Sequence, residues 1–176
     1  MELFDLYDKD RKHLGITMIR GDKQPENTYR IVVHTIIFNS NNQMLIQRRQ
    51  ASKKDWGGMW DLSCGGSTIS GENSQEAASR ELKEELGIDI DYSESRPVLT
   101  LHFDNGFNDF YIINGDYELN ELTLQEEEVA EVKWATKDEI DELVNAGEFI
   151  PYHEDFIGLL FFLKDKRTTF KSFKNK

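Results

Sequence analysis

The chain has 176 residues and a formal net charge of −12, with 38% hydrophobic and 31% charged residues. This balance is typical of a soluble globular protein and excludes a largely disordered chain. The negative charge disfavours a ligand held through a phosphate backbone, so we expect no polynucleotide partner. A small anionic substrate is still compatible, because a metal ion and a few basic groups can reverse the field inside a cleft.

The compartment can be inferred from the cysteine content and the apolar segments. Cys64 is the one cysteine, which excludes an internal disulfide and fits a reducing compartment. The start of the chain, Met1–Asp5, lacks the basic and apolar regions of a signal peptide. The longest apolar runs, Ile31–Phe38 and Phe156–Leu163, are too short to span a bilayer. We therefore expect a cytoplasmic protein with no membrane partner.

Hydrophobic runs separated by turn residues predict a series of strands and helices. The first part of the chain, about residues 1–20, is predicted to be a hairpin of Glu2–Tyr7 and Leu14–Ile19. Further strands are expected, in chain order, at Ile31–Phe38, Met44–Arg49, Trp60–Cys64, Val98–Phe103, Phe107–Ile113 and Val129–Ala135. Capping patterns and apolar faces predict three helices, ending at Leu86, about Ala146 and Lys164.

The run Ile31–Phe38 is rich in β-branched residues and suits a strand buried on both faces. The turn at Asn39–Asn42 makes Met44–Arg49 its expected pairing partner. Strands alternate with helices, and no repeat or linker divides the chain. We therefore expect one α/β domain over residues 1–176, with a mixed sheet between helical layers.

The segment Gly66–Ile88 contains the strongest pattern in the chain. Asn73 or Ser74 can cap a helix, and Glu76 is placed to complete a capping box with Asn73. Gly87 can end the helix, because glycine accepts the left-handed conformation found just past a helix. At about 100° per residue, the apolar side chains form one stripe that can pack on a sheet: Ala78, Leu82 and Leu86.

Three carboxylates, Glu81, Glu84 and Glu85, lie together beside this apolar stripe, with Arg80 at their border. Clustered carboxylates repel one another and lower helix stability unless a positive charge neutralises them. A hard divalent cation would do so, since Mg²⁺ is usually held by one or two carboxylates together with substrate phosphate oxygens. An acidic, solvated helix face is the alternative interpretation.

The spacing favours the metal site, because all fixed positions of a known motif are occupied. The residues are Gly66, Glu72, then Arg80-Glu81-Leu82, Glu84-Glu85 and Gly87-Ile88. This arrangement resembles the Nudix box of the Nudix (MutT-like) hydrolases. The resemblance implies a Nudix α/β/α sandwich in which the box forms a loop–helix–loop metal-binding motif. It also implies hydrolysis of a diphosphate linked to another group, with Mg²⁺ or Mn²⁺ as cofactor.

The resemblance implies a role for each matching residue. Glu84 and Glu85 correspond to principal metal ligands, and Glu81 to a further ligand or to the base that activates water. Arg80 would orient these carboxylates and keep them ionised. The backbone of Gly65 would lie near the metal, and the motif would be supported by Gly66, Glu72 and Gly87. An additional acidic residue often comes from a late loop in this family, and the candidates here are Glu126, Glu127 and Glu128.

A narrower resemblance precedes the box, where Arg48-Arg49, Ser52-Lys53-Lys54 and Trp56–Trp60 resemble isopentenyl-diphosphate isomerase and the Nudix hydrolases closest to it. It implies that Arg49 and Lys53 bind the diphosphate of the substrate. The chemical centre of the isomerase is not matched. Its catalytic cysteine falls on Gly65, with Cys64 one position short, and its first metal-binding histidines fall on Lys23 and Arg30.

The most favoured function is therefore a metal-dependent pyrophosphohydrolase that acts on a small-molecule diphosphate. An isomerase-like enzyme is the alternative, because a shift of one residue would restore Cys64. A non-catalytic nucleotide-binding module is the second alternative. The apolar face of the last helix, His153–Lys164, is expected in the core, with a homodimer contact as the other interpretation.

Overall fold

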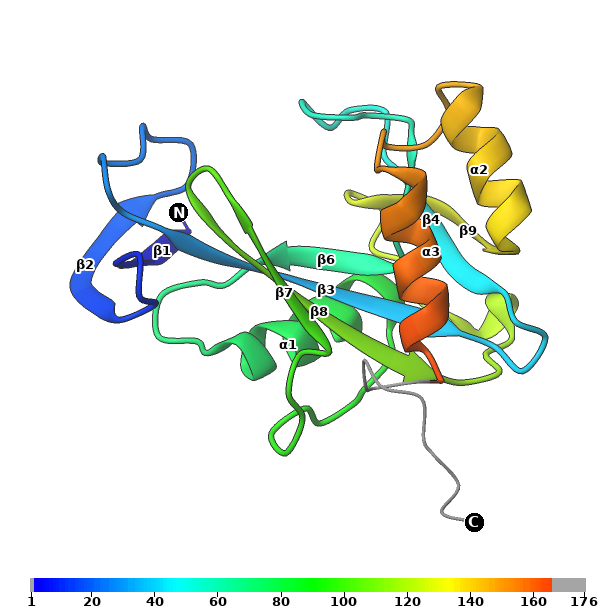
Figure 1. The fold of residues 1–176 in the computed structure, drawn as a ribbon, viewed down its shortest axis with the longest axis horizontal. Helices are drawn as coiled ribbons and strands as arrows, with labels where there is room; N and C mark the ends of the chain where they lie inside the picture. The colour runs from blue at the N-terminus through cyan, green and yellow to red at the C-terminus, as the bar shows by residue number, and fades with distance from the viewer. Residues whose placement is uncertain (1, 166–176) are drawn as a thin grey trace, which may run out of the picture.

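The computed structural model describes residues 2–165; residues 166–176 of the expected domain lie outside this part. A two-stranded hairpin comes first, followed by strands and helices that build one larger sheet with helices on both faces (Figure 1). The strands are β1 (Leu3–Tyr7), β2 (His13–Ile19), β3 (Arg30–Phe38), β4 (Met44–Arg49), β5 (Trp60–Asp61), β6 (Cys64–Ser67), β7 (Leu99–Phe103), β8 (Gly106–Asn114) and β9 (Val129–Ala135). The helices are α1 (Ser74–Leu86), the 3-10 helix η1 (Leu119–Glu121), α2 (Lys137–Asn145) and α3 (Glu154–Leu163).

The larger sheet is mixed, as the sequence predicts. Along the sheet the strand order is β5-β4-β3-β8-β7, with β6 paired to β3 and β9 paired to β4. The strand β3 runs parallel to β8 and antiparallel to β6. Because β3 hydrogen-bonds on both edges and carries an apolar run, it is the central element of the domain.

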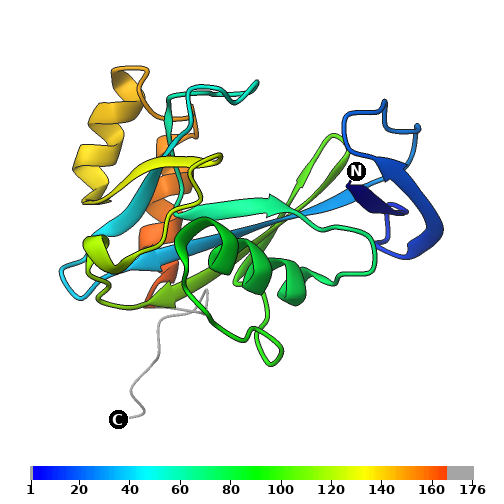
Figure 2. The same ribbon diagram turned by 180° about the vertical axis from the view of Figure 1, so that it is seen from behind.

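Helices cover both faces of this sheet, which confirms the predicted α/β/α layering. The helix α3 lies in front of the sheet in Figure 1, and α1 comes to the front when the molecule is turned in Figure 2. Alternate side chains of β3 enter two separate apolar clusters. Ile31 and Val33 belong to the cluster that includes the leucines of α1, while Ile36 and Phe38 belong to the cluster that includes α2 and α3.

The expected pairing of β3 with β4 is wrong over most of its length. The two strands pair only at Phe38 and Met44; β3 pairs instead with β6, and β4 pairs mainly with β9. Ser63 bridges the point where they separate. Its hydroxyl accepts a hydrogen bond from the Ile37 amide at 2.9 Å and donates one to the Leu45 carbonyl at 2.5 Å.

The predicted strand Trp60–Cys64 is also wrong, because the chain changes partner within it. The β5 residues pair with β4, and the β6 strand, which begins at Cys64, pairs with β3. The intervening Ser63 occupies the bridge between β3 and β4 and therefore cannot continue either ladder. Hydrophobic patterning does not report such a change of partner, since both halves of the segment remain buried.

The hairpin β1–β2 forms its own small sheet, and an ion pair to a buried carboxylate anchors it to the larger one. Arg11, at the turn between the two strands, makes two hydrogen bonds to Asp109 of β8, whose side chain has no exposed surface. Asp109 also accepts hydrogen bonds from Ser74 and Thr100. In the part of the chain that the structure describes, no helix is long and apolar enough to cross a bilayer.

This anchor can be tested by removing its positive charge. Arg11→Met should lower the stability by about 3 kcal/mol, because Asp109 would keep a buried charge without its ionic partner. Adding Asp109→Asn should restore much of the loss. Lys9→Met is the matched control, since the Lys9–Asp10 pair is exposed and contributes little. Thermal unfolding measures all four proteins; a melting temperature for Arg11→Met equal to that of Lys9→Met would contradict the anchoring role.

Candidate active site

The helix α1 is fixed at both ends by the features expected from its sequence. The Asn73 side chain accepts a hydrogen bond from the Glu76 amide, and the Glu76 side chain accepts one from the Asn73 amide, which completes the capping box. Gly87 ends the helix in the left-handed conformation, with φ at 73°. The buried face packs against the sheet through Ala78, Leu82 and Leu86. The acidic residues of the helix consequently lie beside the sheet rather than within its core.

Arg80 is the centre of the acidic cluster. Its guanidinium donates hydrogen bonds to Glu72 at 2.7 Å, to Glu81 at 2.9 Å and to Glu84 at 3.0 Å. A further bond reaches the Ser67 carbonyl at the end of β6. One guanidinium therefore holds three carboxylates and links the helix to the strand.

Glu85 is the buried member of the acidic cluster. Its carboxylate accepts hydrogen bonds from the Gln47 side chain of β4 at 3.0 Å and from the Gly65 amide of β6 at 3.4 Å. It thus lies between β4 and β6, on the side where β4 has separated from β3. Burial, followed by the nearby charge of Glu81, raises the pKa of Glu85 to about 8. Burial likewise raises the pKa of Glu81, although Arg80 opposes that shift.

Two glycines form the boundary between the acidic cluster and a cleft on the other side of β6. A Cβ atom at Gly66 would lie 2.1 Å from an oxygen of Glu81, and one at Gly65 would lie 2.7 Å from Nδ1 of His34. Both distances are too short for any side chain. The glycines therefore allow the carboxylates and the cleft to approach each other with only a strand backbone between them.

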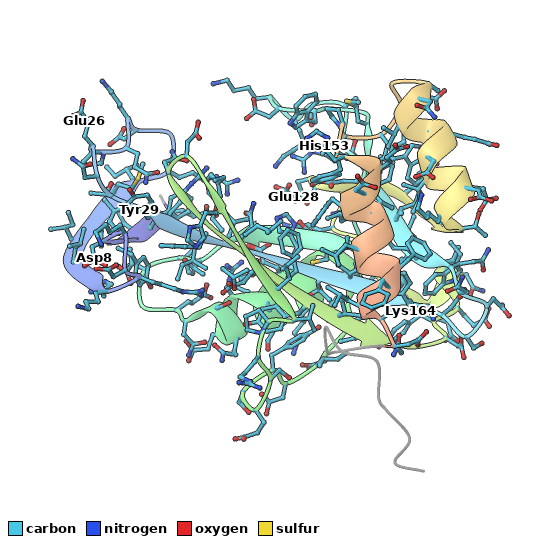
Figure 3. The ribbon with its side chains drawn as sticks, viewed as in Figure 1. Asp8, Glu26, Tyr29, Glu128, His153 and Lys164 are labelled. Atoms are coloured by element: carbon cyan, nitrogen blue, oxygen red, sulfur yellow. The ribbon has the colours of Figure 1, made fainter. Side chains whose placement is uncertain are left out.

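The cleft has a volume of about 460 Å³ and contains both residues that the sequence assigns to substrate binding. Arg49 pairs with Asp61 at 3.5 Å, and Lys53 pairs with Glu128. Figure 3 shows Glu128 near the middle of the molecule. Further lining residues include Arg20, Arg30, Val32, His34, Trp56 and Tyr152.

Of the three acidic candidates in the late loop, Glu128 is the one that lines the cleft. Glu126 and Glu127 are exposed, whereas Glu128 is half-buried and lines the cleft. The sequence could not distinguish them, because all three follow one another in the same polar run. Sequence reasoning also missed Gln47, Arg20 and Arg30 as site residues, since each lies far from the box and inside or beside a strand without a motif of its own.

The donor set fits a hard divalent cation. Glu81 and Glu85 are both largely buried, and after burial itself the charge of Glu81 is the next cause that raises the pKa of Glu85. The side chain of Glu84 is 49% exposed at the open edge. Among residues 2–165, no group of three or more His, Cys, Asp or Glu side chains converges on one point as a metal site. The ion pairs of Arg80 explain this, because they turn Glu81 and Glu84 toward the guanidinium.

Comparisons with known proteins identify the family of this chain. The family model of the NUDIX domain matches residues 28–157. An uncharacterized Nudix hydrolase of Listeria monocytogenes is 47% identical over 168 residues, which cover 96% of this chain and 98% of the relative. The crystal structure of DR0079 from Deinococcus radiodurans matches with a TM-score of 0.72 and 27% identity, over 90% of this chain and 97% of that one. The chain therefore belongs to the Nudix family.

The family and its named relatives support a hydrolase that acts on phosphorus anhydride bonds. The likeness to isopentenyl-diphosphate isomerase is much narrower. The enzyme of Escherichia coli is 42% identical over 59 residues, which cover 34% of this chain and 32% of the isomerase. Cys64 is buried in the cluster beneath α1, and burial raises the pKa of its thiol. The isomerase alternative thus has only weak and partial support.

The buried charge of Glu85 should affect the stability of the metal-free protein. A carboxyl whose pKa is raised by folding destabilises the native state increasingly as pH rises from its ordinary pKa to about 8. Glu85→Gln removes this cost, so its melting temperature should exceed that of the parent at pH 8 and approach it at pH 5. Each kcal/mol corresponds to about 2–4 °C.

Glu84→Gln is the matched control, because the Glu84 side chain lies on the same helix and is 49% exposed, although it also pairs with Arg80. Calorimetry in the presence of a chelator gives both melting temperatures. An equal loss of stability for Glu85→Gln at both pH values would contradict the assignment of a costly buried charge.

Proposed function

We propose that this protein is an Mg²⁺- or Mn²⁺-dependent pyrophosphohydrolase that cleaves a nucleoside diphosphate linked to another group. The observation that carries the proposal is the pair of carboxylates, Glu81 and Glu85, separated from a basic cleft only by Gly65 and Gly66. The acidic side can hold a cation, and the cleft can bind a phosphate-bearing substrate. A helix face without this function would have little reason to bury Glu85.

The residues that would hold the metal are Glu81, Glu84 and Glu85, with the backbone of Gly65 nearby. A bound divalent cation offsets charge on the attacking and departing oxygens of the diphosphate. Glu81 is suited to take the proton of the attacking water, because burial raises its pKa. The oxygen of this water forms a bond to phosphorus as the anhydride P–O bond breaks, which yields two phosphate-containing products.

Arg80 would keep its partners in place through this sequence. Glu81 and Glu84, which would help to hold a cation, both accept hydrogen bonds from Arg80, and Arg80 also donates two hydrogen bonds to Glu72. The two bonds to Glu72, at 2.7 and 3.0 Å, hold the guanidinium independently of them. Arg80 is therefore a positioning residue.

The proposal also covers the type of substrate, the cellular location and the oligomeric state. A small diphosphate rather than a polynucleotide is the substrate, since the net charge is −12. The free, buried Cys64 is consistent with a cytoplasmic location. Leu159 of α3 is 37% exposed, and this helix is where a homodimer would form its contact.

A substrate screen tests the proposed activity. With Mg²⁺ or Mn²⁺, at least one nucleoside di- or triphosphate, sugar nucleotide or dinucleotide should release a phosphate-containing product. Glu85→Gln and Glu84→Gln should each reduce turnover by about 10², as expected for the loss of strong electrostatic stabilisation. Glu127→Gln, on the exposed part of the acidic loop, should leave turnover unchanged.

The same screen includes isopentenyl diphosphate and follows its rearranged product. Rearrangement that Cys64→Ala abolishes would establish the isomerase reaction instead. Failure to turn over any of these compounds, while nucleotides still bind, would establish a binding module.

Arg49 and Lys53 can be tested on the best substrate of that screen. Lys53→Ala should mainly raise KM, because Lys53 binds the diphosphate in the ground state as well as in the transition state. The change also frees the charge of Glu128, which repels an anionic substrate. Arg49→Ala should lower kcat as well, since a planar guanidinium can follow charge redistribution on the phosphate. Lys54→Ala is the exposed control, and unchanged kinetics of the double variant Arg49→Ala/Lys53→Ala would refute both roles.

A further inference from the structure

The cleft contains a cation whose charge is not compensated. Four basic side chains line it, and three have a carboxylate partner: Arg20 pairs with Glu2, Arg49 with Asp61, and Lys53 with Glu128. Arg30 has no ion pair or side-chain hydrogen bond among residues 2–165, and its buried Nε has no partner. In a chain with 33 acidic and 21 basic residues, an unpaired and half-buried guanidinium requires a physical reason.

The surroundings of Arg30 hold it in place without neutralising it. Its guanidinium carbon lies 6.0 Å from the ring centroid of Phe4 in β1 and 5.8 Å from that of Phe103 in β7. Its backbone is fixed in β3, where the Arg30 amide donates to the Asn105 carbonyl at 3.1 Å. Aromatic rings can orient a guanidinium through cation–π contacts, yet they accept none of its ordinary hydrogen bonds.

A second positive charge lies near Arg30. Burial, followed by the charge of Arg20, lowers the pKa of the Arg30 guanidinium. Arg20 follows the end of β2, so the β1–β2 hairpin brings this charge to the cleft. Two adjacent guanidinium groups destabilise each other unless an anion lies between them, and guanidinium pairs are well suited to phosphate oxygens.

We propose that Arg30, supported by Arg20, binds a further phosphate group of the substrate, in addition to the diphosphate held by Arg49 and Lys53. Arg20 and Arg30 come from the hairpin and the start of β3, whereas Arg49 and Lys53 come from the end of β4 and the following loop. The substrate class is therefore a compound with more phosphate charge than a simple diphosphate. The substrate assignment rests on the proposed function, but anion binding at Arg30 does not.

The source of this phosphate can be a longer polyphosphate chain or a separate phosphate ester on the linked group. Both sources would present phosphate oxygens to the guanidinium of Arg30. Inorganic triphosphate is the probe for a continuous chain, and inorganic phosphate is the probe for a separate group. Calorimetry on the full chain in metal-free buffer measures the binding of each probe without turnover.

Arg30→Met should weaken the binding of triphosphate by about tenfold, the loss expected from one charge-assisted hydrogen bond. Arg30→Lys, which keeps the charge, should recover part of this affinity. Arg96→Met is the charge-matched control, because Arg96 is exposed and lies outside the cleft. A parallel loss for inorganic phosphate would indicate a separate phosphate group, while a loss for triphosphate alone would indicate a continuous chain.

Stability provides the second measurement and separates binding from a structural role. Methionine keeps the contact with the two rings and removes an unpaired buried donor, so unliganded Arg30→Met should melt at or above the temperature of the parent. A lower melting temperature with unchanged affinity would overturn the proposal, and so would a parent protein that binds neither probe. If the probes bind through Arg30 while no diphosphate is hydrolysed, only the proposed hydrolase function fails.

Discussion

The ion pairs of the Arg80 guanidinium are the interaction on which the acidic face of the molecule depends. Without them, Glu72, Glu81 and Glu84 would repel one another beside a strand that has no side chains at Gly65 and Gly66. The ion pairs of Arg80 offset this repulsion, and its bond to the Ser67 carbonyl fixes the helix relative to the strand. The acidic cluster thus keeps a high density of negative charge that a bound cation could neutralise. The guanidinium of Arg80 meanwhile prevents the carboxylates from moving apart.

Acidic and basic side chains lie close together on the two sides of one strand. The backbone of β6 separates an acidic cluster from a cleft that contains four basic side chains, in a protein whose net charge is −12. Direct neutralisation across this strand would leave neither side able to bind a ligand. The departure of β4 from β3 makes the arrangement possible, because Glu85 reaches into the opening and contacts Gln47 and Gly65 on its two sides.

Much of this architecture could be predicted from local patterns. The ends of α1 depend on residues close together in the sequence: the capping box of Asn73 and Glu76, and Gly87. The leucine stripe defines the buried face of the helix. The mixed sheet and the two helical layers were predictable from the alternation of elements. The change of partner at Ser63 was not, since it depends on a hydroxyl that bridges two distant strands. The position of Glu128 in the cleft and the unpaired state of Arg30 likewise depend on how segments far apart in the chain pack together.

The link between Arg11 and Asp109 joins residues that are 98 positions apart in the chain. A contact between residues so far apart in the sequence forms only after the intervening chain has become compact. The entropy lost in closing so large a loop must first be offset by other contacts. We therefore expect the hairpin to dock late in folding, onto an already assembled β3–β8 pair. Its docking also brings Arg20 to the cleft, so late docking would complete one end of the proposed binding site. Amide exchange in β1 and β2 would then report openings that leave the rest of the sheet intact.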